Sequence, residues 1–228
     1  MSGFRHEDKY LIDSAQAGIL RLKAEGAFFH DPYAGADGMY RISSLYFDDP
    51  DNTCFYDNED GTGKREKYRI RIYNDDPGYL RLERKEKRGG LTRKTSAEIS
   101  PEQCGMMMRG ETPEAYKGQA PVADSLFQEM RLRSMQPKVV VSYRRIPFVY
   151  PAGNVRLTFD HDIESSMVTK GFPGGGMISR PVLPPGMCVM ELKWDGLLPV
   201  HLIEVLQTEG LRRYKFSKYS MCRKVTVY

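Results

Sequence analysis

Hydrophobic and polar residues alternate with a period of two along much of this chain. In "KYRIRIY", Tyr68, Ile70 and Ile72 fall on one side and basic residues fall on the other. Successive side chains of a strand point to opposite faces, so the pattern predicts strands with one apolar and one polar face. We expect eight strands, at residues 4–12, 39–48, 67–73, 79–87, 94–99, 138–149, 155–163 and 188–195.

Four helices are predicted between these strands. The first runs to Gly26 after a cap at Asp13 or Ser14, and the second begins at Ser100, where "SPEQ" forms a capping box with proline at the first helical position. The third spans about 122–135, and a shorter fourth lies in "VHLIEVLQ". Most connections are too short for parallel crossovers, so we expect one α+β domain over residues 1–228, an antiparallel eight-stranded sheet or barrel with helices packed outside.

Composition limits the class of protein. The chain carries 34 Lys and Arg against 30 Asp and Glu, a net charge of +4, which is too small for a general polyanion-coating protein. The four cysteines are scattered without a CxxC pair, so neither a zinc knuckle nor a disulfide framework is expected, and a reducing cytoplasm fits best. No segment approaches the roughly 18 apolar residues that a membrane-spanning helix needs.

Basic residues dominate the polar faces of several predicted strands. For one strand, a solvated face explains such alternation, but several cationic faces in one sheet would set like charges opposite each other. A barrel with these faces inward would form a cationic channel that attracts a polyanion. The charged positions are Arg5, Glu7 and Lys9; Lys67, Arg69 and Arg71; Arg81, Glu83, Lys85 and Lys87; Arg156 and Asp160; and Glu191 and Lys193.

The residue types in this channel suit phosphate. Lys presents a compact charge to phosphoryl oxygens and Arg presents a bidentate fork. The acids Glu7, Glu83 and Glu191 offer hard oxygen ligands, which could hold Mg²⁺ or Mn²⁺ against a triphosphate.

An ordered set of motifs resembles the VTC domain, the polyphosphate polymerase domain of the triphosphate tunnel metalloenzyme (CYTH-like) superfamily. The motifs extend from residue 5 to residue 222: "RHEDKYLI", "SSLYFDDPDNTCFY", "KYRIRIY", "LRLERKEK" with "TRKTS", "VSYRRIPFV", "VRLTFDHDI", "MELKW" and "KFSKYSMC". The resemblance implies an eight-stranded tunnel that transfers the γ-phosphoryl group of ATP to a growing polyphosphate chain, with Mn²⁺ or Mg²⁺.

The resemblance also implies which residues act. Glu191 matches the metal-binding acid of the family. We assign Lys9, Arg69, Arg71 and Lys85 to the catalytic cradle around the β- and γ-phosphates. The other matching phosphate-binding positions are Lys94, Arg145, Arg156 and Lys218. Strand parity adds Arg5, Lys67, Lys87 and Lys193 as phosphate-binding residues, and Glu7 and Glu83 as further metal-binding acids.

Two departures refine this expectation. CYTH enzymes open with an ExExK pattern, whereas here the frame reads Arg5, Glu7, Lys9, so one of the two carboxylates is missing. That disfavours a CYTH-type hydrolase or cyclase. Eukaryotic members are fused to membrane and SPX modules, and this sequence has neither, so coupling to membrane transport would need a separate partner.

Alternatives stay open. Water as the acceptor would make the protein a tripolyphosphatase or nucleoside triphosphatase, and a non-catalytic module would bind polyphosphate or RNA. Nucleic acid is not expected, because the basic strand faces lack aromatic platforms. Arg145 and Arg156 could instead pair with Asp160 or Asp162. Tyr46, Phe47 and Tyr56 fit wall or core packing, or stacking on adenine.

Overall fold

The computed structural model describes residues 5–89, 91–112, 118, 120–214 and 217–227. Its main element is one antiparallel sheet in the order β1-β10-β8-β7-β3-β4-β5-β6, with β2 added beside β7 and β9 beside β8. The strands are β1 (His6–Asp13), β2 (Phe29–His30), β3 (Tyr40–Asp48), β4 (Lys64–Tyr73), β5 (Leu80–Arg88), β6 (Leu91–Ile99), β7 (Gln136–Tyr150), β8 (Val155–Ser166), β9 (Arg180–Pro181) and β10 (Met187–Trp194).

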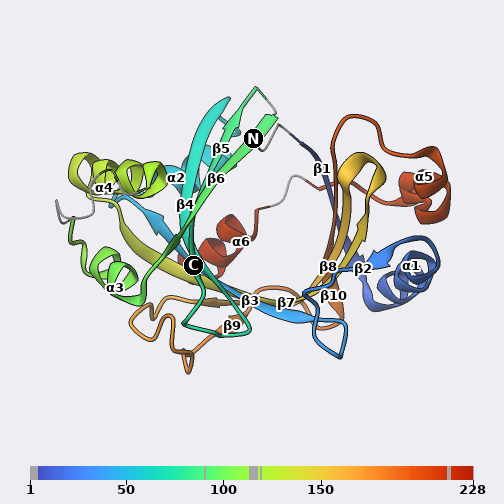
Figure 1. Cartoon of the computed structure of the whole chain (residues 1–228), viewed down its shortest axis with the longest axis horizontal. Coiled ribbons are helices and arrows are strands. Elements are labelled where there is room, and N and C mark those ends of the chain that lie inside the picture. Colours follow the sequence, from blue (N-terminus) through green and yellow to red (C-terminus); the bar gives the residue numbers. More distant parts are fainter. Residues whose placement is uncertain (1–4, 90, 113–117, 119, 215–216, 228) are drawn as a thin grey trace.

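The sheet curls into an arc, so that its two faces differ in curvature (Figure 1). Its edge strands β1 and β6 approach each other where Arg5 forms an isolated antiparallel bridge with Thr92. The α+β class and the antiparallel eight-stranded sheet with helices around it are confirmed. The eight predicted strands appear with ends shifted by a few residues, and β2 and β9 are additional.

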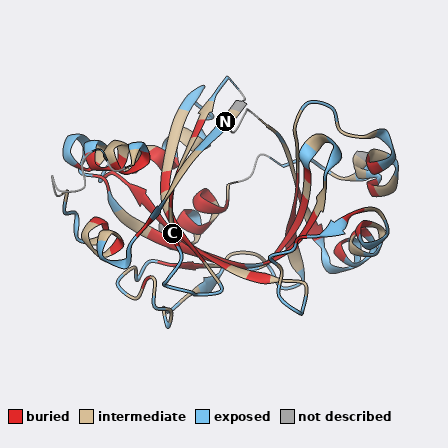
Figure 2. Ribbon diagram, in the orientation of Figure 1, coloured by how far each residue is buried: buried red, intermediate tan, exposed pale blue. Residues whose placement is uncertain are grey.

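The apolar faces of the strands pack against helices on the convex side of the arc. Ile70 and Leu82 are fully buried in a core that includes Leu126 of α4 (Pro121–Arg133) and Met107 of α3 (Pro101–Arg109). A second core joins β1, β8 and β10 to α1 (Ser14–Ala27) and α5 (Val200–Leu206). The buried residues follow the strands and the inner sides of these helices (Figure 2). The polar faces are therefore left on the concave side.

Local signals explain where two helices begin and where a third ends. Capping boxes open α1 at Asp13 with Gln16 and α3 at Ser100 with Gln103. α4 ends before Ser134, which has a left-handed φ of 54°, so the predicted extension to residue 135 is wrong by two residues. Among the described residues, no helix combines the length and hydrophobicity needed to cross a membrane.

Two helices were missing from the sequence prediction, α2 (Thr53–Glu59) and α6 (Lys218–Val227). Asn52, the residue before α2, has a left-handed φ of 59° and makes no side-chain cap. α2 therefore lacks a side-chain cap, whereas Ser217 precedes α6 and its Oγ accepts the backbone N–H of Ser220 at 3.5 Å, a start signal that the sequence prediction overlooked. Short 3₁₀ turns occur at η2 (Ala152–Asn154) and η3 (Thr208–Gly210).

The buried carboxylate of Asp48 joins both missed helices to the sheet. It accepts the backbone N–H groups of Cys54, at 2.9 Å, and Phe55, at 3.2 Å, in α2. The phenol of Tyr219 in α6 donates to the same carboxylate, and its ring lies 5.1 Å from that of Tyr46. This end of β3 thus fixes the position of α6, which lies between the arms of the arc (Figure 1).

We predict that Tyr219→Phe lowers the free energy of unfolding by about 2 kcal/mol, because it removes a buried hydrogen bond to a carboxylate. Urea denaturation measures the change. Tyr33→Phe is the control, since Tyr33 is 85% exposed and should give no effect. Equal stabilities of wild type and Tyr219→Phe would contradict the anchoring role.

Candidate functional site

A cavity of about 810 Å³ lies on the concave side of the sheet. Basic side chains outnumber acidic ones in its lining. The basic residues are Lys9, Arg65, Lys67, Arg69, Arg71, Lys85, Lys87, Arg145, Lys193, Lys218 and Lys224, and the acidic residues are Glu7, Glu59, Asp60 and Glu191.

Strand alternation produces this lining. In β4, Arg69 and Arg71 point into the cavity while Ile70 between them enters the convex core. In β1 and β10, antiparallel pairing sets Lys9 opposite Glu191 and Glu7 opposite Lys193. The wall formed by β1 and β10 therefore carries alternating charges on adjacent strands, whereas the wall formed by β4 and β5 is more cationic.

On the wall formed by β4 and β5, three cations lie around the carboxylate of Glu83. It accepts Nε of Arg69 at 2.8 Å and Nζ of Lys94 at 3.0 Å, and Arg71 lies 3.9 Å away. Burial raises the pKa of Glu83, but the three cations outweigh burial and hold it well below its usual range. Tyr46 also accepts Arg69 at 2.8 Å. Both partners fix the Arg69 guanidinium at the cavity wall.

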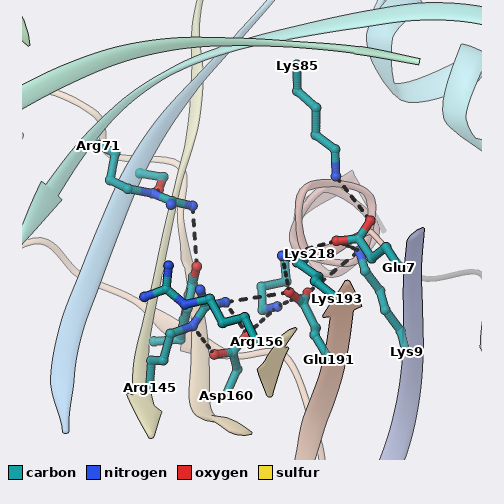
Figure 3. Close-up of polar contacts among 12 residues, drawn as sticks. Glu7, Lys9, Arg71, Lys85, Arg145, Arg156, Asp160, Glu191, Lys193 and Lys218 are labelled. Atoms are coloured by element: carbon teal, nitrogen blue, oxygen red, sulfur yellow. Dashed lines mark hydrogen bonds and ion pairs between the residues drawn. The ribbon is translucent and has the colours of Figure 1, made fainter. Parts of the chain in front are cut away.

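On the opposite wall, Glu191 is the centre of a larger network (Figure 3). Its carboxylate lies 2.7 Å from Lys218, 2.9 Å from Lys193, and 3.6 Å from both Lys9 and Arg145. Burial raises the pKa of Glu191, yet the surrounding cations, Lys193 foremost, hold it well below its usual range. Glu191 is therefore an ionised carboxylate at a cationic site.

Asp160 and Glu7 extend this network at its two ends. Arg145 donates to both oxygens of the fully buried Asp160, at 2.6 and 2.8 Å, and Lys218 lies 2.5 Å away. Glu7 lies 3.1 Å from Lys193 and 3.2 Å from Lys85. Lys85 comes from β5 and Glu7 from β1, so this ion pair links the two arms of the arc across the cavity (Figure 3).

Lys67 has no such carboxylate contact among the interactions found in the described structure. It donates to Asn58 Oδ1 at 2.9 Å and Ser217 Oγ at 3.0 Å, and it lies 5.0 Å from the ring centroid of Tyr219. Burial, followed by repulsion from Lys85, lowers the pKa of Lys67 to about 7. An anion in the cavity would reverse this shift by stabilising the ammonium form.

The VTC domain family model matches residues 4–227. The chain belongs to the VTC domain family.

Two solved structures share the fold of this VTC domain. A protein from Pyrococcus horikoshii OT3 aligns with a TM-score of 0.50 and 13% identity, covering 97% of this chain and 99% of that one. A candidate adenylate cyclase from Bacillus halodurans aligns with a TM-score of 0.50 and 15% identity, covering 92% of each chain. At these identities the similarity shows a common fold. No curated protein sequence matches this VTC domain.

The structure brings most of the predicted site residues of the VTC domain together. Those that line the cavity are Lys9, Arg69, Arg71, Lys85, Lys67, Lys87, Arg145, Lys193, Lys218, Glu7 and Glu191. Glu83 and Lys94 lie outside the lining, although Glu83 contacts the lining residues Arg69 and Arg71.

Arg5 and Arg156 lie away from the cavity lining. Arg5 pairs with Asp195 at 2.8 Å. Arg156 forms an ion pair with Asp31 and donates to the hydroxyl of Tyr40 at 3.2 Å. The sequence offered Asp160 or Asp162 as partners for Arg145 and Arg156. Arg145 does pair with Asp160, whereas Arg156 pairs with Asp31, which the sequence did not indicate.

Sequence reasoning missed several cavity residues. Tyr143 has the same strand parity as Arg145, and its hydroxyl accepts Arg71 at 3.5 Å, so parity could have identified it. Tyr214, Ser217 and residues 58–63, which form the end of α2 and the turn after it, also line the cavity. These residues lie outside the strands, where alternation gives no signal.

We predict that the free energy of unfolding of the ligand-free protein depends on pH through Lys67. The folded-state pKa is about 7 and the unfolded value is near 10.4, so the unfolded chain binds more protons between these values and stability rises with pH there. Lys67→Met should remove this contribution and stabilise the protein at pH 7. Urea denaturation at pH 7 and pH 9.5 tests this prediction. Between pH 7 and pH 9.5, the free energy of unfolding of the wild type should rise relative to that of Lys67→Met. Equal changes in both proteins would contradict the prediction.

Proposed function

We propose that this VTC domain is an ATP-dependent polyphosphate polymerase, which transfers the γ-phosphoryl group of ATP to a growing polyphosphate chain inside the cavity. The observation that carries the proposal is the cavity lining, in which basic side chains from β1, β4, β5, β7, β10 and α6 converge. Membership of the VTC domain family supports a triphosphate- or polyphosphate-related tunnel enzyme.

Phosphoryl transfer depends mainly on positioning and on stabilising charge that spreads over the equatorial oxygens in the transition state. Lys9, Arg69, Arg71 and Lys85 would surround the β- and γ-phosphates from three strands. Ion pairs and hydrogen bonds already hold these side chains. Little reorganisation is therefore needed when substrate enters, which is the condition under which fixed charges are most effective.

The reaction needs no protein nucleophile. The terminal phosphate of the acceptor is already ionised, so its oxygen attacks the γ-phosphorus in line while the bond to the β-phosphate oxygen breaks and ADP leaves. Arg145, Lys193 and Lys218 would hold neighbouring phosphates of the chain. In this scheme the residues orient and neutralise the reactants, and they accept no proton from the attacking group.

The carboxylates fit a divalent metal in part. Glu7 and Glu191 are ionised, face the cavity and both contact Lys9 and Lys193, so their oxygens lie in one small region. Within the described residues, no group of three His, Cys, Asp or Glu side chains could hold a metal. Glu191 and Glu7 would thus hold Mn²⁺ or Mg²⁺ together with substrate oxygens and water. The metal would neutralise charge on the phosphates.

Partners and location follow from the same proposal. ATP and inorganic polyphosphate are the substrates, and the cytoplasm, where ATP is made available, is the compartment. Coupling to a membrane would be supplied by a separate protein. A tripolyphosphatase or nucleoside triphosphatase is the second candidate, because the same cationic cavity would also hold a triphosphate for attack by water.

Product analysis tests the proposal. With ATP and Mn²⁺, we predict long polyphosphate with matching ADP, resolved on a gel and by nucleotide assay. Arg71→Ala should lower turnover at least about 100-fold, as loss of one preorganised donor does elsewhere. It should leave the fold intact, because Glu83 keeps its contacts with Arg69 and Lys94.

Arg81→Ala is the matched control. Arg81 is the register partner of Arg71, but it bonds Tyr79 and Ser96 and does not line the cavity. Equal losses of turnover in Arg71→Ala and Arg81→Ala would contradict the assignment of Arg71 to the phosphate-binding cavity. Free phosphate without long product would identify the hydrolase, and unchanged ATP would reject both enzymes.

We predict that Glu191→Gln raises the Mn²⁺ concentration for half-maximal activity at least about tenfold, because it removes an ionised ligand. A Mn²⁺ titration of the initial rate measures this change. Glu164→Gln is the control, since Glu164 pairs with Arg41 away from the cavity lining. An unchanged titration, with polyphosphate still bound, would favour a metal-independent binding module.

A further inference from the structure

Three tyrosines line the cavity, and one of them differs from the other two. Tyr46 and Tyr143 are buried in the wall, where their hydroxyls accept Arg69 and Arg71. Tyr214 is 46% exposed while it lines the same cavity. Its ring therefore lies where the cavity meets solvent. A half-exposed aromatic ring at the opening of a phosphate-binding cavity calls for a reason.

The main chain ties Tyr214 to the site. Its N–H donates to the carbonyl of Lys9 at 2.8 Å, and the preceding Arg213 forms an isolated antiparallel bridge with Tyr10. Tyr214 thus extends the edge of β1, the strand whose Lys9 and Glu7 enter the cavity. The backbone that carries the ring therefore has a fixed position relative to the cations proposed to hold the phosphates.

The guanidinium of Arg212 lies over the Tyr214 ring, 5.7 Å from its centroid. Such a contact restricts the ring, and a six-membered ring has a second face for another partner. Aromatic side chains bind nucleobases by stacking, which is tolerant of base identity. An inorganic phosphate chain gains nothing from an aromatic surface, whereas a nucleoside triphosphate does.

We propose that Tyr214 is the stacking residue for the nucleobase of a nucleoside triphosphate whose phosphates enter the cavity. This inference rests on the proposed function and adds the subsite for the nucleoside part. Tyr46, Phe47 and Tyr56 do not take this role, since Tyr46 is buried in the wall and the other two are absent from the cavity lining. Because stacking is tolerant, ATP and GTP bind with similar affinity.

Calorimetric titration with ATP and with inorganic tripolyphosphate tests the inference, because only ATP carries a base. Tyr214→Ala should weaken ATP binding roughly tenfold and leave tripolyphosphate binding unchanged. Tyr214→Phe should retain ATP affinity, since the ring remains. These substitutions keep the backbone N–H that bonds Lys9, and circular dichroism with thermal unfolding verifies that each variant is folded.

Tyr79→Ala is the matched control. Tyr79 is 38% exposed and carries Arg81 over its ring at 5.9 Å, yet it lies outside the cavity lining. Its ATP affinity should equal that of the wild type. Loss of ATP affinity in Tyr79→Ala with none in Tyr214→Ala overturns the inference.

The remaining outcomes separate this inference from the proposed function. Equal weakening of ATP and tripolyphosphate in Tyr214→Ala overturns the stacking role, as does no change for either ligand. In both cases binding by the wild type leaves the proposed function standing. Wild-type protein that binds neither ligand rejects the proposed function and the Tyr214 subsite together.

Discussion

Like-charge repulsion inside the cavity is the constraint on which the rest of the structure depends. Cations from opposite walls meet in one space, and only a few carboxylates separate them. Glu83 forms ion pairs with cations at the wall of β4 and β5, and Glu191 and Asp160 form ion pairs with cations at the wall of β8 and β10. Each acid contacts two or more cations. Removing one acid would therefore leave at least two cations without that partner, which is far more costly than losing one surface ion pair.

These carboxylates also determine geometry. Asp160 holds Arg145 through both oxygens, and Lys218 reaches the same carboxylate from α6. Asp48 in turn fixes α6 through Tyr219. A series of buried acids thus connects the end of β3 with the cations of the cavity. The high density of charge in "LRLERKEKR" has the same explanation. Glu83 lies within this segment and holds Arg69 and Lys94, which come from the two neighbouring strands.

Strand parity predicted much of this fold and site, because a period of two is readable along the chain. It placed Glu7, Lys9 and Arg71 on the face that lines the cavity. Parity could not say how far along a strand the cavity extends, so Arg81 and Arg156 share the charged faces but bond residues outside it. Lys218 came only from the resemblance.

The remaining misses have a common cause. The contacts of Asp31 with Arg156, and of Asp48 with Tyr219 in α6, join segments far apart in sequence, and their geometry depends on how the sheet curls. Residues outside helices and strands, such as Tyr214, have no periodic pattern at all. Their placement required the assembled structure.

A crystal structure with tripolyphosphate and Mn²⁺ tests the central claim most directly. The account predicts phosphates between Arg69 and Arg71 on one wall and Lys9 and Lys193 on the other, with anomalous Mn²⁺ density beside Glu191. Phosphate bound elsewhere on the protein, with the cavity holding only solvent, would contradict it.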